Sequence, residues 1–541
     1  MMFSARNVHP AARAYAQEVA DGTLSRREFL TRATALGVSA AGAYALIGVT
    51  PARAQADIQQ GGTMRIQMDV RALKDPPTYD WPQVGNITRG LLEYLVQYNR
   101  DGTFEGRLLE SWEVNEDATQ YIFNLRQGVM WNDGTPFTAE DVAYNLDRWC
   151  DASMEGNSMA SRVGAYQNAD QTGAADGAIE IVDDHTLRLN LSRPDITIIP
   201  TVSDYASAIV KNGFSGNPLD NPVGTGPYRI TEFEVGVRAV LEKNTDHQWW
   251  GEGAALDRIE FIDLGTDQAA HVASAEAGEI DMLYETFGDF IDIMDAIGWS
   301  RSEALSANTL VLRTNRNSPP YDDVRVRRAL ALACDNQVLL DLGINGRGQV
   351  AENHHVCPIH PEYADIGPAQ YDPEAARALM EDAGQSEFEH ELISIDDSWR
   401  RPTTDALAAQ LRDAGFNVTR TIYPGATFWN DWAVYPFSST DWGHRPLGVQ
   451  NLTLAYTAGA AWNETGLASE EFDTMLAEAS AIADADARRD VMARIEQFLI
   501  DDGTIIQPYW RSLYRHFLPN VVGGDTHPIN EIHIHKLGFA A

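Results

Sequence analysis

The sequence predicts an α/β fold divided into more than one domain. The chain has 541 residues, of which 44% are hydrophobic and 22% charged, which is enough to form more than one buried core. Strand and helix patterns alternate in its second half: residues 375–383 and 406–414 indicate helices, and residues 391–395 and 416–422 indicate strands. Alternation of this kind is typical of sheets covered by helices.

The first 54 residues have the pattern of an export signal. Residues 25–30, SRREFL, match a twin-arginine signal, and a modestly apolar stretch follows over about residues 33–49. Small residues then fit cleavage near Ala54 or Ala56, and no cysteine for a lipid anchor is present there. We therefore expect a signal peptide outside the fold and a mature protein in the periplasm. A buried N-terminal helix is the alternative.

Charge and cysteine content narrow the function classes. A formal net charge of −37 repels nucleic acid and anionic membranes, and weakly favours cationic or zwitterionic ligands. The three cysteines, Cys150, Cys334 and Cys357, leave at least one thiol unpaired, and no CxxC motif is present. Cys334 lies in an apolar helical run, so we expect it to be buried. The sequence does not show whether two of the others form a disulfide.

The first half of the mature chain begins with short strands. Four stretches have strand patterns: residues 61–66, 91–96, 109–114 and 121–126. Thr138 then fits the N-cap of a helix, with Glu140 and Asp141 in the first turn, where carboxylates suit the free amides.

Residues 221–230, NPVGTGPYRI, predict a close crossing of two backbone segments. Gly224 and Gly226 permit positive φ angles and close backbone approach, and Pro227 restrains the turn. The stretch lacks the lysine of a phosphate loop and the third glycine of a dinucleotide fingerprint. We therefore expect its glycines to serve backbone geometry.

Several ordered motifs resemble one family. Residues 109–149 are similar to the signature of extracytoplasmic solute-binding proteins of the peptide/nickel transporter family, which are receptors of ATP-driven importers. Residues 221–230 resemble the second landmark of that family. Further matches follow in the family's order: residues 241–250, 256–261, 277–281, 315–333 and 371–384. Together they span nearly the whole mature chain.

The resemblance implies a two-lobed periplasmic binding protein (type II, cluster C), with an extra inserted domain and a cleft closed by a hinge of two strands. Signal peptide and domains would divide the chain as follows: residues 1–54 for the signal, 57–91, 226–310 and 506–541 for domain I, 92–225 for the inserted domain II, and 311–505 for domain III in the second lobe.

The resemblance also implies a function without bond breaking. The protein would capture a peptide-like solute between its lobes as a monomer without a cofactor, and deliver it to the permease subunits of an ABC importer. Ligand contacts to both lobes would favour the closed state. A receptor for an oligosaccharide or a metal chelate remains an alternative. A periplasmic hydrolase is a third, although the sequence shows no nucleophile elbow, zincin or Walker motif.

Candidate ligand-binding residues come partly from the resemblance and partly from aromatic content: Asp441, Trp442, His444, Arg445, Arg401, Trp429, Trp432, Tyr79 and Trp81. In similar peptide receptors an aspartate at the position of Asp441 holds the ligand's α-ammonium, and an arginine near Arg401 clamps its carboxylate. Aromatic walls would grip apolar groups. His444 and Arg445 depart from the family's usual acidic tail, which leaves the ligand class open.

Two histidine-rich segments carry metal-type residues. The first has His354, His355, Cys357 and His360, but its spacing matches no standard site. There we expect a loop that lines the cleft, with a metal site as the alternative. The second has His527, His533 and His535, of which the last two would share one solvent-facing side of a strand. We assign no metal to either segment.

Overall fold

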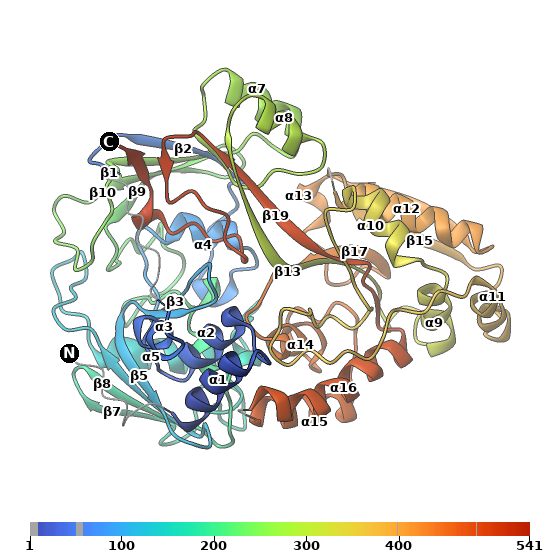
Figure 1. Cartoon of the computed structure of the whole chain (residues 1–541), viewed down its shortest axis with the longest axis horizontal. Coiled ribbons are helices and arrows are strands. Elements are labelled where there is room, and N and C mark those ends of the chain that lie inside the picture. Colours follow the sequence, from blue (N-terminus) through green and yellow to red (C-terminus); the bar gives the residue numbers. More distant parts are fainter. Residues whose placement is uncertain (1–8, 50–57, 398, 483) are drawn as a thin grey trace.

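The computed structural model describes residues 9–49, 58–397, 399–482 and 484–541. The expected cleavage positions Ala54 and Ala56 lie outside these ranges, as does residue 57, where domain I was expected to begin. Two lobes are joined by a pair of long strands (Figure 1). We call residues 58–299 and 518–541 the first lobe, and residues 315–508 the second lobe.

One twelve-stranded sheet extends through both lobes. Its main path runs through β16 (Asn417–Tyr423), β15 (Glu389–Ile395), β17 (Phe437–Trp442), β13 (Ser300–Thr314), β19 (Tyr509–Phe517), β12 (Met282–Leu283), β2 (Thr63–Gln67), β11 (Arg258–Ile262), β10 (Arg238–Lys243) and β9 (Tyr228–Glu234). Two short strands pair beside this path: β14 (Gly348–Val350) with β19, and β18 (Ile505–Ile506) with β13. The predicted α/β class is confirmed.

Strands β13 and β19 form the connection between the lobes (Figure 1). They pair antiparallel, and their register shifts between Leu305 and Thr309. An irregularity of this kind bends and twists a strand locally. The two-stranded hinge implied by the family resemblance is therefore present, with its bend near residues 305–309.

Smaller sheets lie in the first lobe: a four-stranded one of β5 (Leu109–Val114), β6 (Gln120–Leu125), β8 (Thr186–Asn190) and β7 (Ile179–Asp183), a pair of β3 (Val96–Tyr98) and β4 (Phe104–Gly106), and a three-stranded one of β1 (Ile58–Gln59), β21 (Gly538–Ala540) and β20 (Val521–Val522). The predicted strand over residues 91–96 was wrong except at Val96, where β3 begins, because Leu91 lies in a turn and Glu93 forms only an isolated bridge with Ile209.

Helices cover the sheets in both lobes. First-lobe helices are α4 (Pro82–Thr88), α5 (Ala139–Trp149), α6 (Ile198–Thr201), α7 (Gln268–Glu276) and α8 (Phe290–Ala296). Second-lobe helices are α9 (Val324–Leu332), α10 (Asn336–Ile344), α11 (Pro373–Asp382), α12 (Arg400–Asp413), α13 (Gly425–Phe428), α14 (Gly448–Tyr456), α15 (Glu470–Ala481) and α16 (Ala485–Asp502). Thr138 caps α5 in a capping box with Asp141, as predicted.

The glycines of residues 221–230 lie where two segments cross. A Cβ at Gly224 would come within 1.9 Å of the Leu91 carbonyl oxygen, and one at Gly226 within 2.3 Å of the Gly90 oxygen. The Gly226 amide donates to the Leu91 carbonyl at 2.9 Å. The close approach is confirmed, whereas neither glycine has a positive φ. Residues 90–91 and 224–226, which flank the expected inserted domain, therefore lie side by side.

Residues near the N-terminus form three helices: α1 (Pro10–Asp21), α2 (Arg26–Ala35) and α3 (Ala40–Leu46). Ser25 caps α2 by accepting from the Glu28 amide at 3.2 Å. Phe29 and Leu30, within the twin-arginine motif, are buried. We expected this segment to lie outside the fold, but in this structure it packs against both lobes (Figure 1).

All three cysteines are buried free thiols, including Cys334 as predicted. Burial raises the pKa of the Cys334 thiol, which keeps it protonated and unreactive. Among the helices of the described ranges, none has the length and apolar character that a membrane crossing requires.

A buried histidine in the second lobe makes stability depend on pH. His390 lies among Phe388, Phe416 and Phe437, and its Nδ1 is 3.1 Å from the Tyr321 hydroxyl. Burial lowers the pKa of His390 to about 4. Since the unfolded chain takes up this proton near pH 6.5 and the folded chain does not, the free energy of unfolding falls as pH drops from about 6.5 toward 4, by at most about 1.4 kcal/mol per unit.

Replacing His390 with phenylalanine should therefore flatten the acid side of the stability profile by close to one proton. Urea unfolding at pH 7, 6 and 5 measures this slope. His185→Phe, in the half-exposed turn between β7 and β8, is the control and should keep the wild-type slope. A wild-type slope in the His390→Phe protein would show that this proton is not linked to folding.

Candidate functional site

Arginine and aromatic side chains alternate across the contact between the lobes. We call this series the arginine–aromatic ladder: Trp81, Arg71, Trp429, Arg400, Trp399, Arg511 and Phe287. Arg71 and Trp81 come from the first lobe and Trp429 from the second. The Trp81 and Trp429 ring centroids are 4.3 Å apart. Each guanidinium group is attracted electrostatically to the aromatic face beside it, so the ladder holds the lobes together.

Arg400 occupies the middle of the ladder. Its guanidinium carbon lies 4.5 Å from the Trp399 ring centroid and 5.5 Å from that of Trp429. Its Nε donates to Asp441 Oδ1 at 2.8 Å, and its Nη1 pairs with Asp397. Burial lowers the pKa of Arg400, but Asp441 and Asp397 outweigh this and raise it. The group thus stays charged in a desolvated setting.

Arg511, on hinge strand β19, is the last arginine of the ladder and lies between Trp399 and Phe287. Its guanidinium carbon lies 3.7 Å from the Trp399 ring centroid, and Nη2 pairs with Glu285 of the first lobe. Burial raises the pKa of Glu285, against the opposing effect of Arg511. A strand that belongs to the hinge therefore carries a charge that contacts residues of both lobes.

A cavity of about 250 Å³ opens at this end of the ladder. It lies between residues 286–291 of the first lobe and residues 342–347 of the second, and Trp399 and Arg511 form part of its wall. Apolar walls with a few convergent charges are typical of small-molecule sites.

A second contact between the lobes is a buried ion pair. The Asp204 carboxylate of the first lobe lies 2.8 Å from Arg445 Nε of the second lobe, and Arg162 Nη1 of the first lobe is 3.0 Å from the same oxygen. Each of the three side chains is no more than 5% exposed. Burial raises the pKa of Asp204, but both arginines outweigh it and lower it. The pair is therefore ionised.

Tyr98 and His444 meet beside this ion pair. His444 Nδ1 accepts from the Ala307 amide at 3.0 Å, so its Nε2 carries the proton and lies 3.4 Å from the Tyr98 hydroxyl. The rings stack with centroids 6.0 Å apart. His444 thus joins its own lobe, the hinge strand β13 and the first lobe.

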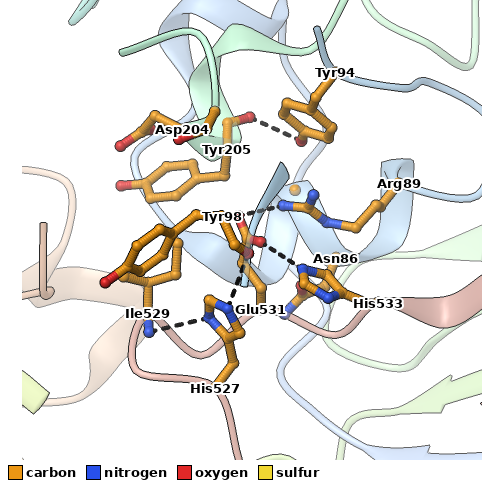
Figure 2. Close-up of polar contacts among 12 residues, drawn as sticks. Asn86, Arg89, Tyr94, Tyr98, Asp204, Tyr205, His527, Ile529, Glu531 and His533 are labelled. Atoms are coloured by element: carbon orange, nitrogen blue, oxygen red, sulfur yellow. Dashed lines mark hydrogen bonds and ion pairs between the residues drawn. The ribbon is translucent and has the colours of Figure 1, made fainter. Parts of the chain in front are cut away.

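Figure 2 shows how the first lobe supports Tyr98 from below. His527 Nε2 donates to the Tyr98 carbonyl at 3.1 Å, and its Nδ1 accepts from the Ile529 amide at 3.4 Å. His533 donates to Glu531 at 3.0 Å, and Arg89 pairs with the other Glu531 oxygen. Residues 527–533 therefore form a hydrogen-bonded support for the part of the first lobe that carries Tyr98.

These residues also form a candidate metal-binding group. Within the described part of the chain, His527, Glu531 and His533 are the residues whose possible ligand atoms all lie within 4.8 Å of one another. A cation would have to displace the contact of Glu531 with Arg89 or that of His527 with Tyr98. Because these side chains already satisfy each other, we assign them a structural role. The predicted solvent-facing strand at residues 533–535 was wrong, since His533 precedes and His535 lies in the 3-10 turn η5 (Ile534–Lys536), and both side chains are partly covered.

The segment with His354, His355, Cys357 and His360 is buried inside the second lobe. His360 is 3.1 Å from the Arg445 carbonyl through Nε2, and His355 is 2.9 Å from the Tyr456 hydroxyl through Nδ1. Burial lowers the pKa of His360 to about 4 and that of His355 to about 3, so both are neutral. The segment supports the His444–Arg445 loop from behind.

The nine predicted site residues fall into two sets. Trp81, Trp429, Asp441, His444 and Arg445 lie at the contact between the lobes.

Four others are placed elsewhere. Arg401 points outward, where it pairs with Asp396 and Asp405 at a half-exposed surface. Trp442 donates its indole N–H to Glu464 inside the second lobe. Trp432 packs against a buried cluster of the same lobe, formed by Ile393, Ile395 and Phe428. Tyr79 is fully buried in the first-lobe core. Adjacent helix positions point in different directions, which is why Arg400 and not Arg401 faces Asp441.

Several residues of the contact were missed: Arg71, Trp399, Arg400, Arg511, Asp204 and Tyr98. The sequence did offer one signal for Arg511. An arginine within an otherwise apolar strand such as residues 509–517 is expected to be buried, and a buried charge indicates a partner of opposite charge. The pairing of Asp204 with Arg445 had no sequence signal, because the two residues lie far apart in the chain. The neighbouring contact of Tyr205 with Arg445 joins residues 240 positions apart. As a whole, the contact offers charges of both signs beside aromatic faces, which suits a zwitterionic or carboxylate-bearing solute.

Comparison with known proteins gives a consistent result. A family model described as bacterial extracellular solute-binding proteins, family 5, matches residues 103–464. The periplasmic oligopeptide-binding protein OppA of Salmonella typhimurium is 25% identical over 96% of this chain and 97% of its own length. The dipeptide-binding protein of Escherichia coli is 28% identical over 57% of this chain and 59% of its own.

Solved structures show the same fold. The murein tripeptide-binding protein MppA of Escherichia coli superposes with a TM-score of 0.80 at 21% identity, over 90% of this chain and 99% of its own. The protein AgaA of A. tumefaciens, in complex with agropinic acid, gives a TM-score of 0.78 at 21% identity, over 89% of this chain and 99% of its own.

Proposed function

Because the chain belongs to the bacterial extracellular solute-binding proteins of family 5, we propose that it captures a peptide-like solute between its lobes and delivers it to the permease of an ABC importer. The observation that carries this proposal is the Arg400–Asp441 pair at the contact between the lobes, 2.7 Å apart and flanked by Trp399 and Trp429. Cation, anion and aromatic faces meet there, as a zwitterion with apolar side chains requires.

In the proposed site, Asp441 holds the ammonium group of the solute and Arg400 takes the carboxylate role that the sequence assigned to Arg401. Asp441 and Arg400 pair with each other in the present structure. A zwitterionic solute would replace this one ion pair with two: its ammonium with Asp441, and its carboxylate with Arg400. Trp81 and Trp429 form walls. Since these contacts come from both lobes, bound solute favours closure by population shift.

The division into domains belongs to the same proposal: 57–91, 226–310 and 506–541 as domain I, 92–225 as an inserted domain II, and 311–505 as domain III. The adjacent ends of the inserted part support it, because Gly226 binds Leu91 through the backbone. Export by the twin-arginine route, cleavage near Ala54 or Ala56 and action as a periplasmic monomer complete the proposal.

One observation favours a different solute on the same scaffold. The ladder contains three arginines, Arg71, Arg400 and Arg511, and guanidinium groups match carboxylates in a bidentate way. A solute with several carboxylates would use this set better than a simple peptide. The solved relative with agropinic acid shows that the fold holds a ligand of another class.

A thermal-shift screen of the exported protein distinguishes these solutes. A peptide pool should raise the melting temperature, since a ligand at 100 times its Kd stabilises the native state by about 2.7 kcal/mol. Asp441→Ala should abolish the shift, whereas Asp396→Ala, a half-exposed carboxylate paired with Arg401, should keep it. A shift only with carboxylated non-peptides or sugars would replace the peptide assignment, and an unchanged shift in Asp441→Ala would remove that residue from the site.

A further inference from the structure

The three N-terminal helices form a compact unit with its own apolar core. Tyr15 of α1, Phe29 and Leu30 of α2 and Ala43 of α3 are buried together. Figure 1 shows the unit in front of the junction between the lobes, with β5 on one side and α14 and α16 on the other. We call residues 10–46 the N-terminal unit.

The N-terminal unit is bonded to the first lobe. The Trp112 indole donates to the Ala35 carbonyl at 3.2 Å, and the Phe104 amide donates to Thr34 Oγ1 at 2.9 Å. A Cβ on Gly37 would lie 2.6 Å from the Trp112 carbonyl oxygen. A glycine pressed against a neighbouring backbone, together with one buried and one partly buried hydrogen bond, indicates a fitted surface.

The same unit is bonded to the second lobe. Arg32 Nη2 donates to the Pro361 carbonyl at 3.3 Å, and Arg489 of α16 donates to that same oxygen at 2.9 Å. Arg489 also pairs with Glu28 at 3.4 Å, and Asp486 lies 3.9 Å from Arg32. The Arg32 side chain is only 4% exposed, so its charge is buried against the second lobe.

Arg27, the second arginine of the twin-arginine pair, turns toward the gap between the lobes. Its Cγ would lie 3.4 Å from a Cβ on Gly102. Burial raises the pKa of the Tyr98 hydroxyl and the charge of Arg27 opposes this, and the same charge helps burial to lower the pKa of His444 and of His360. Tyr98 and His444 are residues through which the two lobes touch near the Asp204–Arg445 pair.

We propose that the two lobes carry a joint docking surface for the chain's own N-terminal unit, and that the docked unit holds the lobes closed until it is removed. This inference rests on the proposed function, in which the lobes must open to admit solute. The surface exists in this form only when the lobes are together, because Trp112 and Phe104 lie on one lobe and Pro361 and Arg489 on the other. A segment that binds the closed state better than the open one must shift the population toward closure.

The docked unit has a second consequence. While it is bound, Arg27 of the export motif lies against Gly102 of the first lobe, whereas Arg26 lies over the Tyr44 ring of the unit itself at 5.2 Å. A receptor that reads both arginines must therefore first detach Arg27 from the first lobe. Export and later cleavage then release a receptor that is free to open.

The test measures the distance between the lobes without any solute, so it does not depend on which solute the protein takes. Spin labels at Val182→Cys and Gln497→Cys, both exposed and on different lobes, report the distance by double electron–electron resonance. The native cysteines are buried, so the labels attach to the two introduced thiols. A protease site inserted between residues 50 and 57 allows the N-terminal unit to be cut and removed by gel filtration. The intact chain should give one short, narrow distribution, and the cut chain a longer and broader one.

Arg32→Glu in the uncut chain gives an independent variant. It removes the Pro361 bond and faces Asp486 and Glu28 with a like charge, so it should broaden the distribution as cutting does. Gln17→Ala, on the exposed side of α1, is the matched control and should leave it unchanged. The proposal is overturned if the unit leaves and the distance stays short, or if Arg32→Glu matches Gln17→Ala. Loss of the peptide-induced thermal shift, by contrast, would concern the proposed function alone.

Discussion

Replacing Asp204 with asparagine should open the lobes of the exported protein and weaken solute binding at least about 100-fold. The change leaves Arg162 and Arg445 buried in the closed state without a countercharge. Removing one partner of a buried ion pair costs about 3–5 kcal/mol, because the remaining charge stays desolvated. Opening hydrates Arg445, so the cost falls on the closed state and the equilibrium moves toward the open one.

Two measurements check this result: the distance between spin labels on the two lobes, and the affinity for a solute found in the thermal-shift screen. The control is Glu180→Gln in the same lobe, where an exposed pair with Arg188 contributes at most about 1 kcal/mol. A closed distance distribution with unchanged affinity in the Asp204→Asn protein would show that the buried pair does not govern closure.

Replacing Trp429 with alanine should lower solute affinity by about 10- to 100-fold with a smaller effect on melting temperature. The ring is half-buried and contacts Trp81, Arg71 and Arg400, so its loss breaks the middle of the ladder. An aromatic pair contributes about 0.5–1.5 kcal/mol beyond its area, and each cation–π contact about 0.5–2 kcal/mol.

Trp432→Ala is the matched comparison, three positions along the chain. Trp432 packs against the buried cluster of Ile393, Ile395 and Phe428 in the second lobe, so its removal should lower the melting temperature and leave affinity nearly unchanged. Calorimetric titration and thermal unfolding of both variants separate the two effects. If Trp429→Ala lost stability and kept its affinity, the ladder would be packing and not a binding wall.

Much of the architecture could be predicted from local patterns. The alternation of helix and strand in residues 375–422 matches α11, β15, α12 and β16, because hydrophobic periodicity is set within each element. The glycines at 224 and 226 indicated a close crossing, because only a missing Cβ permits it. The order of strands in the twelve-stranded sheet had no such local signal and was not predicted.

The site was predicted less well than the fold. Asp441, chosen from the family resemblance, and Trp429, chosen from a loop rich in rings, lie at the contact between the lobes, whereas Arg401 was chosen where Arg400 faces the contact. That choice depends on where α12 begins, and a shift of one residue turns a side chain by about 100°. Pairs such as Asp204 and Arg445 depend on how the lobes close, which the spacing of residues along the chain does not encode.

The N-terminal segment shows the same limit. Composition and order of its regions indicate an export signal, and they say nothing of how it sits on the folded body. The apolar residues that suit a signal peptide also suit burial, as Phe29 and Leu30 show. Tertiary contacts with Trp112 and Pro361 therefore gave it a place that the local pattern did not predict.

Native mass spectrometry of the exported protein, mixed with a peptide pool, tests most directly whether the protein binds a solute at this site without breaking it. We expect a one-to-one complex whose released ligand has the mass of an intact peptide from the pool, and we expect this complex to be missing for Arg400→Ala and present for Arg401→Ala. Peptide fragments after incubation, or a complex that Arg400→Ala retains at wild-type abundance, would contradict the account.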